Sequence, residues 1–338
     1  MDHVIWEGSH YEIGFRWGTL LEQRGNYILG YVPFPITEER VRFGAACVPA
    51  YQTWFPEILA ELQGLADGQH CQVELLQAVL FSMYAIQPTC HCSCLAVSNG
   101  KEILLGRNSD FLPELEEQNL NVLCHAAGAC RFTGNTTAFA EMEDGVNEHG
   151  LAVGLTSVYT RRARPGLNAG MLARLFLEQC RTVREVLELV RRLPIASAQT
   201  FTLADAAGEI AVVECDGEHM EVLRPTEEHP YVCAVNTFHA PPLAGTLPAG
   251  LDDWAAETRY QTMVRALDRK ARTTGLRGIQ DILSGREGFL CQYDRNTGRD
   301  TVWSVVYDLK NGRVYRAEGN PGQEAFRPDR SFRFVRDM

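Results

Sequence analysis

Apolar residues recur at helical spacing through much of the first 91 residues. The stretch 73–86 is almost wholly apolar, as expected for a buried helix. In 51–67 the apolar positions fall on one face of a helix, and they are Phe55, Ile58, Leu59, Leu62 and Leu65. The pattern predicts that residues 1–91 form a helical segment, and no residue in it points to chemistry.

At Cys92 the pattern changes to short apolar strands joined by turn sequences. The clearest turns are SNGK (98–101), DAAGE (205–209) and LKNGR (309–313), and each predicts an antiparallel hairpin. Helical patterns lie between them at 167–180, 182–193 and 254–272, and Thr182 with Glu185 has capping-box spacing. Hairpins that alternate with helices predict an α+β protein of antiparallel sheets covered by helices, not a parallel βαβ sheet.

Composition and charge limit which partners and which cell compartment we expect. The 338-residue chain has a net charge of -11 and no Lys/Arg-rich run, so we expect no nucleic-acid partner and no membrane-surface partner. The N-terminus lacks the apolar stretch of a secretion signal, and no window is long enough to span a membrane, which favours a cytoplasmic protein. The eleven cysteines are scattered through apolar segments, as expected for small core residues in a reducing compartment.

One predicted hairpin carries a candidate nucleophile. With Asn99-Gly100 as a two-residue turn, residues whose numbers sum to 199 face each other, so Cys92 lies opposite Arg107. At a Cβ separation of about 5 Å the guanidinium can lower the pKa of the thiol, and Asp110 follows at the strand end. A cysteine flanked by an arginine and an aspartate is typical of a nucleophile site.

Other interpretations of this segment are open at this point. Cys92 and Cys94 could be core residues, with the arginine and aspartate as a surface ion pair. Cys90, His91, Cys92 and Cys94 could bind a metal, although Cys-x-Cys-x-Cys is not the usual spacing and no second Cys/His cluster completes a tetrahedral site. Cys92 could also act in an uncut chain with a distant base such as His239, as in papain-like hydrolases.

The segments CSCLAV (92–97) and GRNSDF (106–111) resemble the nucleophile hairpin of the linear amide C-N hydrolases. These N-terminal-nucleophile enzymes include choloylglycine hydrolases and acyl-CoA:6-aminopenicillanate acyltransferases. Similar segments follow in order at GVNEHGLAVGL (145–155), TLADAAGEIAVVEC (202–215), AVNTFH (234–239) and ETRYQTM (257–263). Ordered matches are more specific than any single motif. The resemblance implies a four-layer αββα sandwich of antiparallel sheets, an oxyanion-hole role for Asn236, and Arg259 as a second active-site arginine.

The N-terminal segment resembles the precursor region of the acyltransferase branch in GSHYEIGFRWG (8–18) and ELQGLADG (61–68). The resemblance implies self-processing before Cys92, which would separate a helical segment 1–91 from a catalytic domain 92–338 that remains associated with it. Two positions depart from the family. His91 stands where the penicillin acyltransferases have glycine, and Thr156 where bile-salt enzymes carry asparagine.

The mechanism implied by the resemblance needs no cofactor and no metal. Cys92 would be the nucleophile, and its freed α-amine, with a reference pKa of about 7.7–8.0, would be the base. Asp110 would hold that amine, Asn236 would donate to the oxyanion, and Arg107 and Arg259 would stabilise negative charge. Water or an amine would then resolve the acyl-enzyme.

The expected substrates are small N-acyl amides or acyl thioesters. Segment 111–120 mixes apolar and acidic residues, and the later loop carries Tyr159 and three arginines at 161, 162 and 164. Together they could line an acyl pocket with a charged rim. The alternatives are a papain-like thiol hydrolase without processing and a catalytically inert binding protein on the same fold. The sequence is also compatible with a homo-oligomer.

Overall fold

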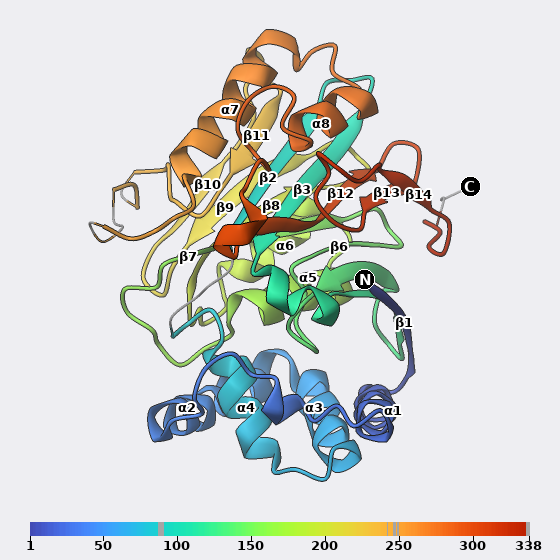
Figure 1. Cartoon of the computed structure of the whole chain (residues 1–338), viewed down its shortest axis with the longest axis vertical. Helices are drawn as coiled ribbons and strands as arrows, with labels where there is room; N and C mark the ends of the chain where they lie inside the picture. Colours follow the sequence, from blue (N-terminus) through green and yellow to red (C-terminus); the bar gives the residue numbers. More distant parts are fainter. Residues whose placement is uncertain (87–90, 242, 246–247, 249, 336–338) are drawn as a thin grey trace.

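The computed structural model describes residues 1–86, 91–241, 243–245, 248 and 250–335. Within them, two stacked β-sheets form the centre (Figure 1). Neighbouring strands are antiparallel except β1 and β4, which run parallel. The larger sheet has the order β1 (Asp2–Gly8), β4 (Leu120–Ala126), β5 (Phe132–Thr136), β6 (Asp144–Asn147), β7 (Ala152–Val158), β8 (Ala198–Ala204), β9 (Ile210–Cys215) and β10 (Met220–Leu223). The smaller has the order β11 (Tyr231–Ala234), β2 (His91–Ser98), β3 (Ile103–Phe111), β12 (Asp300–Asp308), β13 (Arg313–Ala317) and β14 (Arg327–Asp329).

Helices cover the outer faces of the two sheets. α5 (Ala169–Gln179) and α6 (Val183–Val190) pack on the larger sheet, and α7 (Ala256–Lys270) and α8 (Leu276–Leu283) pack on the smaller. One apolar cluster fills the space between the sheets, and another lies under each pair of helices. The structure therefore confirms the predicted α+β sandwich with four αββα layers. The sequence pattern did not predict α8.

The N-terminal segment packs as a separate layer of helices beside α5 and the larger sheet (Figure 1). The expectation of an entirely helical segment is wrong at its start, because residues 2–8 alternate in burial and form strand β1 of the larger sheet. The helix expected over 51–67 is broken at Phe55, because Pro56 lacks an N–H and begins a new helix. The elements are α1 (His10–Gln23), η1 (Ile28–Gly30), α2 (Glu38–Trp54), α3 (Pro56–Gly68) and α4 (Val73–Ser82).

Glycines bring α1 and α3 into backbone contact. A Cβ atom on Gly14 would lie 1.9 Å from a carbonyl oxygen of α3, and one on Gly64 would lie 2.1 Å from a carbonyl oxygen of α1. Gly18 and Gly68, one turn further along, approach each other in the same way. Only residues without a Cβ permit this approach. The two segments that resemble the precursor region therefore form a single packed pair of helices.

A buried ionic cluster joins this helical pair to α5. His10 of α1 lies between two carboxylates, with Nδ1 2.8 Å from Glu61 of α3 and Nε2 3.3 Å from Glu178 of α5. Arg174 of α5 pairs with the same two carboxylates, Glu61 at 2.8 Å and Glu178 through its Nε. All four side chains are at most 5% exposed. Two cations and two anions balance when His10 carries its proton.

The hairpin turn after β2 differs from the expected two-residue turn. Asn99 Oδ1 accepts hydrogen bonds from the N–H groups of Lys101 and Glu102, and this side-chain turn makes the loop span 99–102. The register shifts by two residues, so Cys92 faces Ser109 and Cys94 faces Arg107. The prediction that Cys92 lies directly opposite Arg107 in the hairpin is therefore wrong. The hairpins expected at 205–209 and 309–313 are confirmed as β8–β9 and β12–β13.

Candidate active site

Cys92 is buried near the start of β2, and its side chain meets the side chain of Arg107. The Nη2 of Arg107 lies 2.8 Å from Cys92 Sγ, although the two residues are not directly opposed in the hairpin. The long arginine side chain spans the diagonal between strands, which is within the usual reach of such pairs. The predicted contact between guanidinium and thiol is therefore present in a register that the sequence did not indicate. Both residues are at most 1% exposed.

Two carboxylates that sequence analysis missed hold Arg107 in place. Nη2 lies 3.2 Å from Glu143, Nη1 lies 2.9 Å from Asp144, and Nε donates to the Leu155 carbonyl at 2.9 Å. Asp144 also accepts hydrogen bonds from Trp303 Nε1 and from the Tyr307 hydroxyl, at 2.9 and 2.6 Å. An acidic pair within an otherwise buried β-stretch was the available signal, because buried carboxylates require partners. The guanidinium is thus aimed at the sulfur by fixed neighbours.

Asp110 lies in the same buried site but does not pair with Arg107. Its carboxylate accepts hydrogen bonds from Tyr293 at 2.9 Å and Thr301 at 2.6 Å, and Arg259 Nη1 lies 3.6 Å away. Burial raises the pKa of Asp110 to about 6, against the opposing effect of Arg259. The alternative of a surface ion pair between Arg107 and Asp110 is wrong, since both side chains are buried.

Asn236 and Arg259 hold the backbone on either side of the Cys92 Cα. The Cys92 N–H donates to Asn236 Oδ1 at 2.9 Å, and Arg259 Nη1 donates to the Cys92 carbonyl at 2.6 Å. Arg259 Nη2 also donates to Asn236 Oδ1 at 2.9 Å, which fixes which end of the amide is oxygen. Asn236 follows β11, and Arg259 lies in the first turns of α7. The structure therefore brings together the five residues expected at the site.

The buried thiol is a weak acid in the intact chain. Burial raises the pKa of Cys92 to about 12, and the charge of Arg107 opposes this rise while Glu143 and Asp110 add to it. A thiol with such a pKa is almost wholly protonated at neutral pH, and the thiolate is the nucleophile. Chemistry at this sulfur needs a base that removes its proton.

The remaining candidates are Thr156 and His239, and each has defined contacts with its neighbours. The Thr156 hydroxyl donates to the Val235 carbonyl at 2.8 Å and so supports the residue before Asn236. The His239 ring stacks on Tyr260 with 3.6 Å between centroids, and its Nε2 lies 3.1 Å from Glu257. The histidine that a papain-like mechanism would use as base thus lies against Tyr260 and Glu257, and its Nδ1 has no hydrogen-bond partner among the described residues. Within the described residues, which exclude Cys90, no group of three or more His, Cys, Asp and Glu side chains is placed to hold a metal ion.

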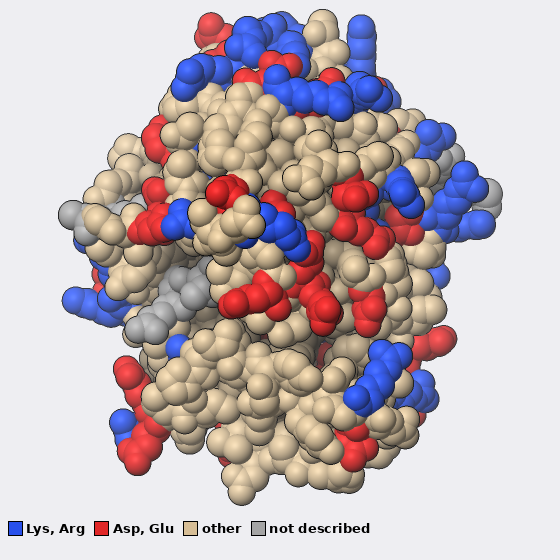
Figure 2. All heavy atoms as spheres, in the orientation of Figure 1, with Lys and Arg blue, Asp and Glu red and all other residues tan. Residues whose placement is uncertain are grey.

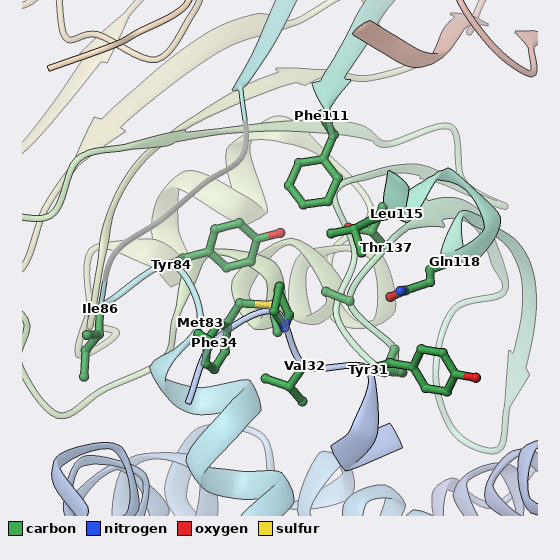
Figure 3. A pocket seen from close by; sticks show the side chains of 13 residues that line it. Tyr31, Val32, Phe34, Met83, Tyr84, Ile86, Phe111, Leu115, Gln118 and Thr137 are labelled. Atoms are coloured by element: carbon green, nitrogen blue, oxygen red, sulfur yellow. The ribbon is translucent and has the colours of Figure 1, made fainter. Parts of the chain in front are cut away.

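An apolar pocket lies below the ends of β2 and β3 (Figure 3). Thr137 in its wall donates to Glu143 Oε1 through N–H and Oγ1, at 3.1 and 2.7 Å, and Glu143 contacts Arg107. The pocket is thus linked to the sulfur through three side chains. Its apolar lining comes from residues on both sides of Cys92 in the sequence, and includes Val32, Phe34, Met83, Phe111, Leu115 and Phe139.

The pocket continues into an outer groove with an acidic edge. Asp2, Glu114 and Glu117 line this groove, with Arg24 as its basic residue. Figure 2 shows acidic side chains gathered across the middle of this face, near the N-terminus and segment 113–118. In contrast, Arg162 and Arg164 of the basic loop are both paired with Glu218. Among the described residues, no helix has the length and apolarity needed to cross a membrane.

Comparison with known proteins gives a family and a fold. The family model of the acyl-coenzyme A:6-aminopenicillanic acid acyl-transferases matches residues 97–323, which include Arg107, Asp110, Asn236 and Arg259 and begin five residues after Cys92. A sequence search of curated proteins gave no significant match.

Similar solved structures were found at low sequence identity, and the first of them, with a TM-score of 0.50, supports the fold. A Caenorhabditis elegans ortholog of N-acylethanolamine-hydrolyzing acid amidase is 18% identical with a TM-score of 0.50, over 65% of this chain and 93% of the other. Penicillin V acylase from Agrobacterium tumefaciens is 13% identical with a TM-score of 0.46, over 72% and 99%. A variant of conjugated bile acid hydrolase from Clostridium perfringens is 14% identical with a TM-score of 0.48, over 73% and 99%.

Proposed function

Because this chain belongs to the acyl-coenzyme A:6-aminopenicillanic acid acyl-transferase family, an N-terminal-nucleophile family of amide hydrolases and acyltransferases, we propose that it is a self-processing cysteine amidase or acyltransferase with Cys92 as nucleophile. The supporting observation is the pairing of Cys92 Sγ with Arg107 at 2.8 Å, while Asn236 and Arg259 bind the backbone N–H and C=O of the same residue. Each donor and acceptor around Cys92 is itself held by buried partners. Such preorganisation is the main source of electrostatic catalysis.

The first step in this proposal is cleavage of the bond between His91 and Cys92. The sulfur attacks the His91 carbonyl carbon, the carbon–nitrogen bond breaks, and the thiol proton passes to the departing nitrogen, which becomes the α-amine of Cys92. Water then hydrolyses the thioester and restores the thiol. The products are segments 1–91 and 92–338. They would remain associated through strand β1, which pairs with β4 along its whole length, and through the His10 cluster.

The released amine supplies the base that the buried thiol needs. An α-amine has a pKa of about 7.7–8.0, so it can take the thiol proton near neutral pH and later return it to the leaving amine. Asp110, in the strand paired with β2, would hold the amine, and its buried carboxylate is fixed by Tyr293 and Thr301. Asp110 thus acts through its charge and position.

Asn236 and the two arginines would stabilise the tetrahedral intermediate. We assign donation to the oxyanion to Nδ2 of Asn236, which in the intact chain donates to the Ser157 carbonyl at 2.8 Å. Arg107 and Arg259 are both fully buried, so their charges act at low dielectric. Removal of one oxyanion donor in such sites lowers kcat by about 10²–10³-fold.

The pocket and its edge indicate the substrate class. The apolar pocket, which is linked to the sulfur through Thr137, Glu143 and Arg107, suits an apolar part of a substrate, and the acidic groove into which it continues favours a neutral or cationic amine over a polyanionic carrier. We therefore infer that small to medium N-acyl amides are cleaved with release of a free amine. Folded polypeptides are too large to enter this pocket.

The test is a substrate panel read by mass spectrometry. N-acyl amines, N-acyl amino acids, acyl-CoA thioesters and denatured protein are each incubated with the enzyme, and Cys92 is examined for an acyl adduct. We expect adducts and free amine from N-acyl amines, and no adduct in Cys92→Ala. Transfer only from thioesters would make the protein an acyltransferase. No adduct from any compound would favour an inert binding protein.

A further inference from the structure

His91, the residue before the nucleophile, is held against an aromatic surface. Its ring stacks on Trp254 with 4.4 Å between centroids and an interplanar angle of 15°. His91 Nδ1 is buried without a hydrogen-bond partner among the described residues. Burial, followed by the charge of Arg259, lowers the pKa of His91 to about 3, so the ring is neutral. The ring is therefore placed as a flat, uncharged group on an aromatic face.

The backbone that presents Trp254 is strained. Trp254 and Ala255 both have left-handed φ values, 52° and 57°, which non-glycine residues rarely adopt. The surrounding structure compensates, since Arg259 donates to the carbonyls of Asp253 and Trp254 at 3.1 Å each. Strain of this kind is retained where a side chain must be held in one place. The indole is thus fixed by the same arginine that binds the Cys92 carbonyl.

The indole is also part of a continuous aromatic wall that reaches Asp110. Tyr293 packs against Trp254 at 62°, with 5.5 Å between centroids, and its hydroxyl donates to the Asp110 carboxylate at 2.9 Å. Trp254 is only 8% exposed in the intact chain. Departure of His91 would uncover the face of the indole inside the site.

Self-processing and substrate turnover place their acyl groups on the same atom. In processing, the carbonyl carbon of His91 becomes bonded to Cys92 Sγ, and in turnover the substrate carbonyl carbon takes that position, with the same residues around it. The substituent that His91 carries on its carbonyl therefore marks where a substrate's acyl substituent lies. In histidine, two carbons separate the carbonyl carbon from a planar ring.

We propose that the face of Trp254 covered by His91 is the acyl subsite of the mature enzyme, and that it selects acyl groups with a planar ring two carbons from the carbonyl, such as 3-arylpropanoyl amides. This inference rests on the proposed function and adds a substrate class to it. Trp254 is a specificity-determining residue in this assignment. Processing uses the subsite once for His91 and turnover uses it repeatedly for substrate.

The experiment compares two amides that differ only in ring planarity. The 3-phenylpropanoyl and 3-cyclohexylpropanoyl amides of one fluorogenic amine are assayed with the processed enzyme, and kcat/KM is measured for each. We expect the phenyl compound to be preferred by about 3- to 10-fold, as for other aromatic contacts. Trp254→Leu should reduce the ratio to about one, and Trp254→Phe should keep part of it. Tyr260→Leu is the matched control on α7, since this ring stacks on His239, and it should leave the ratio unchanged.

The outcomes separate this inference from the function on which it rests. A wild-type ratio near one, or a preference that persists in Trp254→Leu, overturns the aromatic subsite even if Cys92 is acylated. If the leucine variant does not fold, the aromatic subsite is tested by the wild-type ratio of kcat/KM and by the ratio in Trp254→Phe. No acyl adduct on Cys92 from either amide overturns the proposed function and the subsite together.

Discussion

Protonation of His10 should control how firmly the N-terminal segment is held. Burial alone would lower the pKa of His10, but hydrogen bonds and charges from Glu178 and Glu61 outweigh it and raise the pKa from 6.5 to about 9. At about 1.4 kcal/mol per pKa unit, this shift stabilises the folded chain by about 3 kcal/mol. Because the folded pKa is raised, the contribution is complete below pH 6.5 and is lost as pH rises through about 9. The buried neighbour Cys124 keeps its proton there, since burial raises its pKa to about 12.

The assay is urea unfolding between pH 6 and pH 10 in a Cys92→Ala background, which should keep the chain in one piece under the proposed function. His10→Gln is compared with the parent at each pH, so that groups common to both cancel. We expect the parent to lose about 3 kcal/mol more than His10→Gln over this range. Equal pH dependence in the two proteins would show that His10 is not charged between Glu61 and Glu178, and the reasoning would be refuted.

Three further substitutions test other parts of the structure. Asp110→Asn should keep the fold but slow processing and lower kcat by about 10²-fold, because the amine loses its charged partner; near-wild-type rates would contradict this role. Gly64→Ala should lower the free energy of unfolding by about 1–3 kcal/mol in thermal melts, because its Cβ would meet a carbonyl of α1 at 2.1 Å, whereas Gly30→Ala, with nothing within 4 Å, should not. Glu143→Gln should lower the pKa of Cys92, since a nearby negative charge is removed, and an unchanged pH profile of iodoacetamide alkylation would argue against it.

The sequence predicted the layers of the fold, and which side chains gather around Cys92, better than the register and contacts between them. Strand and helix periodicity depends on local spacing, so the hairpins at 205–209 and 309–313 could be predicted directly. The turn at 99–102 could not, because the Asn99 side chain extends it by two residues. Arg107 still reaches Cys92 because its side chain is long enough to tolerate the shift.

The features that sequence analysis missed depend on contacts between distant segments. Glu143 and Asp144 become partners of Arg107 only when the two sheets stack, so their acidic pair in a buried stretch did not by itself indicate that partner. Strand β1 pairs with β4 more than a hundred residues later, and its short alternation was overlooked beside the helical pattern of the next residues. Trp254 likewise meets His91 only through the placement of α7 over the smaller sheet.

Intact mass of the purified protein tests the central claim most directly. If Cys92 becomes an N-terminal nucleophile, wild-type protein should give two associated chains, 1–91 and 92–338, and Cys92→Ala should give one. N-terminal sequencing of the larger fragment should begin at Cys92. A wild-type chain that remains whole while it cleaves amides would contradict the account and favour a thiol hydrolase that uses another base.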